Sequence, residues 1–224
     1  MFDLDLKKEI DIAKHVLQKK ERKTIVVYIH GLHGSHEESK YFDFFNKYFE
    51  VVGLDYPDGN PWELEDIFKS RFAELTKDYK DIIVIANSLG AFLSVQYLSE
   101  FNIKQAFFIS PLCSMPLMIR GIAANNGLSM EKFKEMHHVT LKDGTELSYD
   151  YYEYLLNNKD NWNVPTDILY GSEDELIPLC SVISFISYHP HVRLSVKEGS
   201  KHYFHTEEEK EYIKDWILRS LIND

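Results

Sequence analysis

Three residue types that together can make a reactive nucleophile follow apolar segments of this chain. Ser88 follows the apolar run Asp81–Ala86, carboxylates follow Asp167–Tyr170, and histidines follow Arg193–Val196. A serine hydroxyl is a weak nucleophile near neutral pH, and it becomes reactive when a histidine oriented by a carboxylate takes its proton. The sequence therefore contains the groups needed for nucleophilic attack on a carbonyl carbon.

The stretch around Ser88 has two interpretations. Ala86-Asn87-Ser88-Leu89-Gly90 leads from an apolar run into a helix-like run. A serine at this place could simply cap the start of the helix. It could instead be a nucleophile in a tight turn, because the small residues Ala86 and Gly90 let the start of the helix lie close to the end of the strand.

The acid and the base each have rivals within their own loops. The candidate acids are Glu173, Asp174 and Glu175, and the candidate bases are His202 and His205. The loop after Ile109 reads Ser-Pro-Leu, so it offers no further carboxylate. Along the chain the order is serine, then acid, then histidine.

Apolar runs that alternate with amphipathic stretches must position these loops. The runs predict strands at Thr24–Ile29, Glu50–Leu54, Asp81–Ala86, Gln105–Ile109, Asp167–Tyr170 and Arg193–Val196. Helices are predicted near Glu37–Tyr48, Pro61–Tyr79, Ser88–Phe101, Pro178–Tyr188 and Glu207–Leu221. Strands that are apolar throughout are buried on both faces. The predicted fold class is α/β, a mostly parallel central sheet of about six strands with helices on both faces, and ligands of such sheets bind beyond the carboxyl ends of the strands.

One segment interrupts the alternation. After Ser110-Pro111, about fifty residues pass before the next strand, far more than an ordinary connection. The segment begins with apolar residues rich in methionine and later carries a turn at Lys142–Thr145 and a tyrosine cluster at Tyr149–Tyr154. We predict that residues 112–163 form a lid-like insertion over the strand ends, with extra core as the alternative.

The length and the N-terminus set the domain organisation. The 224 residues contain no Gly/Ser linker, which predicts one domain over residues 1–224. Apolar residues at helical spacing predict a surface helix over about residues 3–20.

Charge and cysteine content limit which classes of partner and which cellular compartment we expect. A formal net charge of −11 without a basic block argues against nucleic-acid and anionic-membrane partners. No apolar stretch reaches the ~20 residues that cross a bilayer. Cys113 and Cys180 make no disulfide framework, and no basic leader precedes an apolar core, so we expect a cytoplasmic protein.

Ten histidines raise the question of a metal site. His30, His33 and His36 recur every three residues. They lie in a glycine-containing loop without the helical register that would bring their rings together, and the cysteines show no Cys-x-x-Cys spacing. We predict no metal and no cofactor.

The loops together resemble those of the α/β-hydrolase superfamily, and the chain looks like one of its small single-domain serine carboxylesterases. The likeness runs from about Thr24 to the C-terminus. The nucleophile motif Gly-x-Ser-x-Gly is matched at residues 86–90, where Ala86 departs from the pattern by one methyl group. The order serine, aspartate, histidine is also the order of that superfamily.

The resemblance selects among the rivals. The family pattern places an aspartate three residues after the glycine that ends its strand, as Asp174 follows Gly171, and a histidine three residues after a glycine, as His202 follows Gly199. It therefore implies Ser88, Asp174 and His202 as the catalytic residues.

The resemblance also implies an oxyanion hole. The segment His30-Gly31-Leu32 matches the family's His-Gly-x segment. By resemblance, the backbone N–H groups of Leu32 and Leu89 bind the negative charge of the tetrahedral intermediate. His30 is expected to have a structural role.

These residues predict a serine hydrolase that cleaves a carboxylic ester or thioester of a small, partly apolar molecule through an acyl-enzyme. Two alternatives remain. The same triad could cleave peptides or amides, with an amine bound by acidic residues of the insertion, namely Glu131, Glu135, Glu146, Asp150 and Glu153. The fold could also serve as a non-catalytic binding protein.

Overall fold

A parallel sheet lies at the centre of the fold. The computed structural model describes residues 24–157 and 161–223, so the helix predicted for about residues 3–20 lies outside the described residues. The strand order in the sheet is β2-β1-β3-β4-β7-β8. The strands are β1 (Thr24–Ile29), β2 (Glu50–Gly53), β3 (Asp81–Asn87), β4 (Ile103–Ile109), β7 (Thr166–Gly171) and β8 (Val192–Lys197). Every neighbouring pair in this sheet is parallel, which confirms the predicted fold class.

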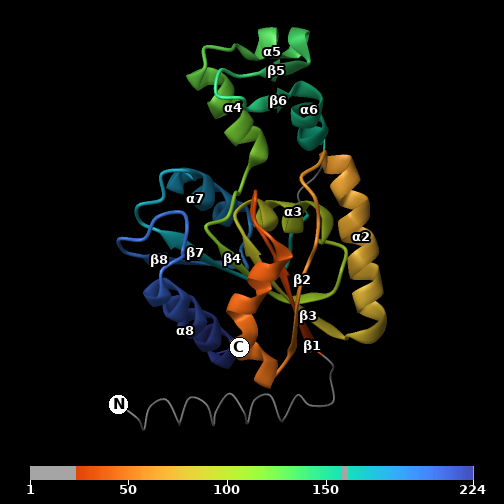
Figure 1. Cartoon of the computed structure of the whole chain (residues 1–224), viewed down its shortest axis with the longest axis vertical. Coiled ribbons are helices and arrows are strands. Elements are labelled where there is room, and N and C mark those ends of the chain that lie inside the picture. Colours follow the sequence, from red (N-terminus) through yellow and green to blue (C-terminus); the bar gives the residue numbers. More distant parts are fainter. Residues whose placement is uncertain (1–23, 158–160, 224) are drawn as a thin grey trace.

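Helices cover both faces of the sheet (Figure 1). The helices on one face are α2 (Pro61–Asp78), α3 (Leu89–Tyr97) and α7 (Leu179–Tyr188), and those on the other are the 3₁₀ helix η1 (His36–Lys47) and α8 (Glu207–Asn223). Successive strand residues alternate between the two cores, as Val84 packs toward α2 and α3 while Ile85 packs toward η1 and α8. The central strand β3 is therefore apolar at successive positions, because both of its faces are covered.

Most predicted elements are present, with shifted ends and one difference in type. The strand predicted at Gln105–Ile109 begins at Ile103, and the strand predicted at Glu50–Leu54 ends at Gly53. The helix predicted near Glu37–Tyr48 is a 3₁₀ helix. Amphipathic spacing over so short a stretch does not distinguish three from 3.6 residues per turn.

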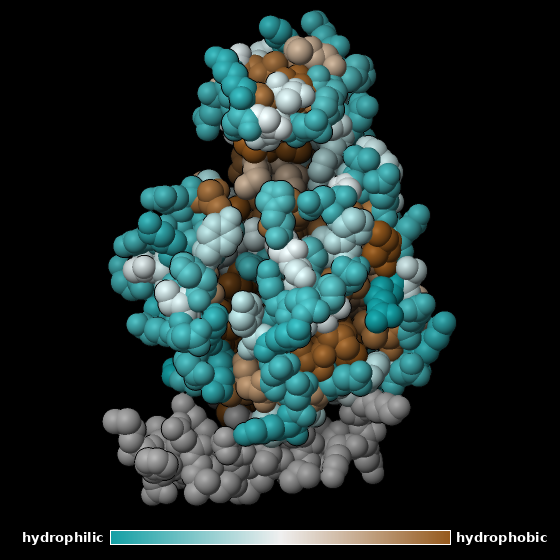
Figure 2. Space-filling view, in the orientation of Figure 1, coloured by the Kyte–Doolittle hydropathy of each residue, from teal (hydrophilic) through white to brown (hydrophobic). Residues whose placement is uncertain are grey.

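The segment between β4 and β7 forms a unit that projects from one end of the sheet (Figure 1). It contains α4 (Met115–Asn125), α5 (Met130–Met136), the antiparallel pair β5 (His138–Thr140) and β6 (Glu146–Ser148), and α6 (Tyr149–Asn157). Its own small core contains Ile119, Ala123, Phe133, Leu147 and Tyr152. Figure 2 shows apolar surface where this insertion meets the rest of the molecule. Its role as a lid over the strand ends stays a prediction.

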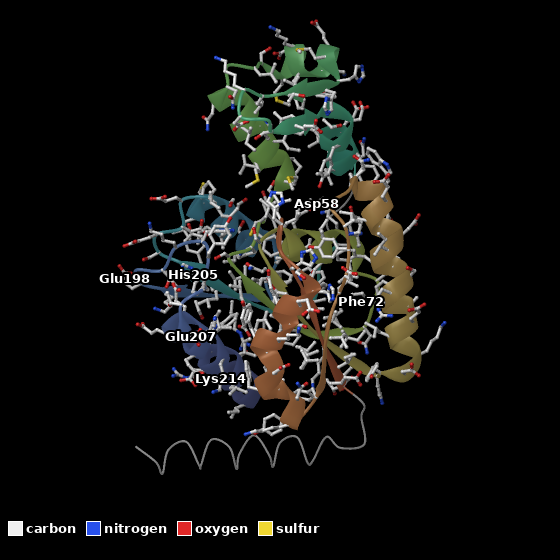
Figure 3. All side chains as sticks on the ribbon, in the orientation of Figure 1. Asp58, Phe72, Glu198, His205, Glu207 and Lys214 are labelled. Carbon is white, nitrogen blue, oxygen red and sulfur yellow. The ribbon has the colours of Figure 1, made fainter. Side chains whose placement is uncertain are left out.

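The ends of the strands that carry the predicted site face this insertion. Asp58, in the loop after β2, lies at the end of the sheet on which the insertion stands, whereas Phe72 of α2 lies among the buried side chains beside the sheet (Figure 3). None of the described helices is both long and apolar enough to cross a lipid bilayer.

A buried carboxylate ties three strands to α8. Asp167 on β7 accepts hydrogen bonds from Gln105 on β4 at 2.9 Å and from Arg193 on β8 at 2.7 and 2.9 Å. Ser220 of α8 also donates to it. Only 8% of the Asp167 side chain is exposed, so its removal leaves the buried Gln105 amide without this acceptor and the Arg193 guanidinium without its carboxylate partner.

We therefore expect Asp167→Ala to lower the free energy of unfolding by about 2–3 kcal/mol, measured by urea denaturation. The matched control is Asp215→Ala, which removes a carboxylate that accepts from Arg219 on the exposed side of α8. This control should change stability by less than about 0.5 kcal/mol. Equal changes in the free energy of unfolding for the two substitutions would contradict the structural role given to Asp167.

Candidate active site

The candidate nucleophile lies in a strained turn between β3 and α3. Ser88 has a positive φ of 48° with ψ −112°, which is unusual for a residue with a side chain. Its N–H donates to the Ile109 carbonyl at 3.0 Å, and its own carbonyl accepts from Ala91 and Leu112 at 3.1 Å. The Ser88 side chain makes no capping hydrogen bond to α3, so the helix-cap interpretation has no support.

Glycine permits the close packing around this turn. A Cβ at Gly90 would lie 2.4 Å from the carbonyl oxygens of both Ile29 and His30, far inside contact distance. A Cβ at Gly31 would lie 3.2 Å from the Ser88 Cβ. The loop after β1 is thus packed directly against the nucleophile turn.

The three predicted side chains come together at the carboxyl end of the sheet. His202 Nε2 lies 3.0 Å from Ser88 Oγ, and His202 Nδ1 lies 2.8 Å from Asp174 Oδ2. With the proton on Nδ1 donated to the carboxylate, Nε2 is free to accept the serine proton. The side chains of His202 and Asp174 are 6% and 0% exposed, so little water competes for these hydrogen bonds.

The loop after β7 fixes the carboxylate. Asp174 Oδ1 accepts from the N–H groups of Leu176 and Ile177, both at 2.9 Å, which leaves Oδ2 for the histidine. The rivals Glu173 and Glu175 are exposed. A Cβ at Gly171 would lie 2.3 Å from the Ser200 carbonyl oxygen, so glycine lets this loop approach the loop that carries His202.

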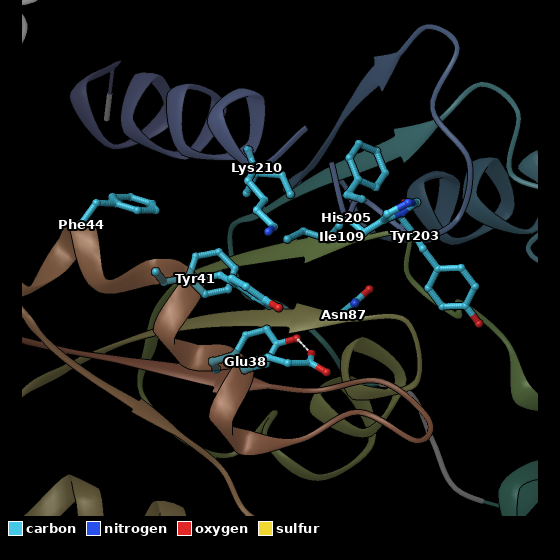
Figure 4. A pocket seen from close by; sticks show the side chains of 12 residues that line it. Glu38, Tyr41, Phe44, Asn87, Ile109, Tyr203, His205 and Lys210 are labelled. Atoms are coloured by element: carbon cyan, nitrogen blue, oxygen red, sulfur yellow. Dashed lines mark hydrogen bonds between the residues drawn. The ribbon is translucent and has the colours of Figure 1, made fainter. Parts of the chain in front are cut away.

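The rival base lies elsewhere. His205 is exposed, and its Nδ1 donates to the Tyr203 carbonyl at 2.9 Å. It lines a smaller cavity of about 230 Å³ between η1 and α8, where Glu38, Asn87 and Lys210 also lie (Figure 4). Asn87 lines both this cavity and the larger one that contains Ser88, and within the described residues its buried Oδ1 has no hydrogen-bond partner.

The two predicted oxyanion donors flank Ser88. Leu32 and Leu89 line the same cavity as Ser88 and His202. Among the described residues, the N–H groups of Leu32 and Leu89 have no hydrogen-bond acceptor. Leu89 is the first residue of α3, where the unpaired N–H groups and the helix dipole favour negative charge.

A large, mainly apolar cavity of about 1060 Å³ opens onto Ser88. Its apolar walls come from the start of the insertion and from the loop after β7, and they include Leu112, Met115, Leu117, Met118, Ile122, Leu176 and Ile177. Apart from His202 of the candidate site, the charged side chains of its described lining are His33, if protonated, and the carboxylates Glu38, Asp58 and Glu175. The sequence predicted these cavity walls only in part, because no pattern near Ser88 indicates which distant residues enclose the cavity.

The histidines of the β1 loop have separate surroundings. His30 is buried and stacks on Tyr56, His33 lies 3.7 Å from Asp58, and His36 lies 3.2 Å from Asp55. In the part of the chain that the structure describes, no three potential ligands are grouped so that they could hold a metal ion.

Comparison with known proteins identifies the fold. No family model and no curated protein matches the chain. Among solved structures, Est1E from Butyrivibrio proteoclasticus matches over 91% of this chain and 90% of its own at 19% identity, with a TM-score of 0.68. Mouse alpha/beta hydrolase domain-containing protein 10 matches over 89% of each chain at 14% identity, with a TM-score of 0.70. An esterase from Exiguobacterium antarcticum matches over 90% of this chain and 92% of its own at 13% identity, with a TM-score of 0.61. The chain has the α/β-hydrolase fold.

The close packing at Gly90 gives a stability test. We expect Gly90→Ala to lower the free energy of unfolding by about 2 kcal/mol, because the new methyl group would force two backbone carbonyls apart. Gly121→Ala is the control, since a Cβ at this helical position meets nothing within 4 Å. It should leave stability unchanged or raise it by up to about 1 kcal/mol. Equal thermal unfolding of Gly90→Ala and the unmodified protein would contradict the tight-turn account.

Proposed function

We propose that this chain, which has the α/β-hydrolase fold, is a serine hydrolase that cleaves a carboxylic ester, with Ser88 as nucleophile, His202 as general base and acid, and Asp174 as the orienting carboxylate. The observation that carries the proposal is the hydrogen-bonded series from Asp174 through His202 to Ser88, which opens onto an apolar cavity.

Each group has a defined part in the proposed reaction. His202 Nε2 takes the Ser88 proton as Oγ attacks the ester carbonyl carbon, and Asp174 stabilises the imidazolium that forms. The N–H groups of Leu32 and Leu89 bind the oxyanion of the tetrahedral intermediate. His202 then donates its proton to the departing alkoxide oxygen, which leaves an acyl group on Ser88. Water, deprotonated by His202, attacks this acyl group, and the acid is released as Ser88 regains its proton.

The lining of the cavity supports an uncharged, partly apolar substrate. Apolar side chains of α4 and of the β7 loop provide the contact surface, while the acidic lining residues Glu38, Asp58 and Glu175 repel anions. The neighbour from Exiguobacterium antarcticum is described as an esterase, which agrees with ester chemistry at such a site. A thioester of a strongly anionic carrier fits this lining less well than a neutral ester does.

The two alternatives have less support. The acidic residues that could bind the amine of a peptide all have exposed side chains and are absent from the cavity lining; they are Glu131, Glu135, Glu146, Asp150 and Glu153. A non-catalytic binding protein would have no need for the buried hydrogen-bond series or for the strained backbone at Ser88.

Substitution of the proposed catalytic groups tests the proposal. We expect Ser88→Ala and His202→Ala each to lower kcat on a p-nitrophenyl ester by about 10⁴-fold or more, and Ser88→Ala to abolish labelling by a fluorophosphonate probe. Matched controls are Ser114→Ala, a serine of the same cavity, and His205→Ala, the exposed rival base. Retained labelling of Ser88→Ala, or equal losses in His205→Ala and His202→Ala, would refute the assignment.

The acidic lining makes a prediction about substrate charge. Of two p-nitrophenyl esters of adipic acid, one with a free distal carboxylate and one methylated there, we expect the methylated ester to have a kcat/KM about tenfold higher at low salt. The difference should shrink between about 20 and 500 mM salt, because ions screen exposed charges. Glu175→Gln should reduce the difference, while Glu208→Gln on the exposed side of α8 should not. If the ratio of the two kcat/KM values changes neither with salt nor with Glu175→Gln, the acidic lining does not repel anionic substrates.

A further inference from the structure

The β1 loop that carries the proposed oxyanion donor Leu32 has little anchorage of its own. One backbone hydrogen bond, from Gly34 N–H to the Gly31 carbonyl at 3.0 Å, closes a turn within it. Leu32 is 58% exposed, and His33 has a positive φ of 59°. Because a donor to a developing oxyanion acts only from the correct position, another group must hold this loop.

His30 is the residue through which the loop is held. Its ring is buried, and its Nδ1 lies 2.8 Å from the Gly31 carbonyl oxygen. Tyr56, in the loop after β2, contacts both the ring and the backbone carbonyl of His30. The two rings stack with centroids 4.0 Å apart and planes within 8°, and the Tyr56 hydroxyl donates to the His30 carbonyl.

The same carbonyl oxygen also lies against the nucleophile turn. Gly90 is so close to it that a Cβ there would lie at 2.4 Å. The His30 carbonyl is therefore held between the Tyr56 hydroxyl and the first turn of α3, the helix whose first residue, Leu89, is the other proposed donor. A shift of this carbonyl would change the separation of the two donors.

Tyr56 is itself rigidly placed. It is 7% exposed, and its ring meets Phe68 of α2 edge to face, with centroids 5.1 Å apart. Burial, followed by the nearby Asp58 charge, raises the pKa of Tyr56 well above its usual value, so its hydroxyl remains a donor throughout the range in which the protein would act.

We propose that Tyr56 is a positioning residue for the oxyanion hole. Its hydroxyl fixes the His30 carbonyl, and the backbone from His30 to Leu32 then holds the Leu32 N–H at the distance from Leu89 that the tetrahedral intermediate requires. The inference rests on the proposed function, but it concerns a residue outside the Ser88–His202–Asp174 set. Tyr56 also lines the cavity in front of Ser88, so an unchanged KM in a Tyr56 variant is the readout that separates positioning from direct substrate contact.

The direct test is Tyr56→Phe, which keeps the stacked ring and its packing on Phe68 and removes only the hydroxyl. We expect kcat for a p-nitrophenyl ester to fall about tenfold or more while KM stays within about twofold, because a donor is displaced that acts chiefly in the transition state. The inhibition constant of a trifluoromethyl ketone, which forms an oxyanion adduct with the serine, should rise by the same factor as kcat/KM falls.

Tyr97→Phe is a closely matched control. Tyr97 is also buried, also meets Phe68 edge to face, and its hydroxyl donates to the Pro61 carbonyl at 2.8 Å, away from the cavity. Its removal should cost similar thermal stability and leave both kcat and the inhibition constant within about twofold of the unmodified protein. Equal catalytic losses in the two variants would assign the effect to stability and overturn the inference.

The outcomes separate this inference from the proposed function. An unmodified protein that hydrolyses no ester and takes up no fluorophosphonate would refute the function itself. An active unmodified protein, together with a Tyr56→Phe variant that keeps its kcat and its inhibition constant, would refute only the role of Tyr56.

Discussion

The close contact between the nucleophile turn and the loop after β1 is the constraint on which the site depends. Ser88 is held at a positive φ, and Gly90 lies against the carbonyl oxygens of Ile29 and His30 with no room for a Cβ. Holding a non-glycine residue in this region costs on the order of 1–3 kcal/mol. Hydrogen bonds from Ser88 to Ile109 and from Leu112 to Ser88, at the end of the buried strand β3, offset this cost. The serine hydroxyl is thereby turned out of the helix and toward His202.

The parallel sheet explains why groups distant in the sequence meet there. Because all six strands run in one direction, the loops after β1, β3, β7 and β8 lie at the same end of the sheet. Asp174 and His202 come from the loops of two paired strands, and Gly171 lets those loops approach each other. The insertion between β4 and β7 adds apolar walls from α4 to the cavity in front of Ser88. Each loop thus supplies one requirement of the proposed chemistry, and the sheet supplies their common location.

Much of this arrangement could be predicted from local patterns. Continuous apolar runs predicted the parallel sheet. The resemblance to the α/β-hydrolase pattern then selected Asp174 and His202 among their rivals, and the structure brings these residues within hydrogen-bond distance. The structure inside the insertion was not predicted, because its strands have three residues each and short amphipathic stretches carry little periodicity. The contacts of Tyr56 were also not predicted. A tyrosine in a loop gives no sign in the sequence of which carbonyl it will bond, since that depends on how two loops from neighbouring strands are packed.

The proposal that Ser88 forms a covalent acyl-enzyme is tested most directly by trapping that intermediate. The protein would be mixed with excess p-nitrophenyl acetate, quenched in acid within the pre-steady-state phase, digested and sequenced by tandem mass spectrometry. The account predicts a burst of p-nitrophenol close to the enzyme concentration and an acetyl group on Ser88. No burst, or an acetyl group found only on surface lysines or on another serine, would contradict it.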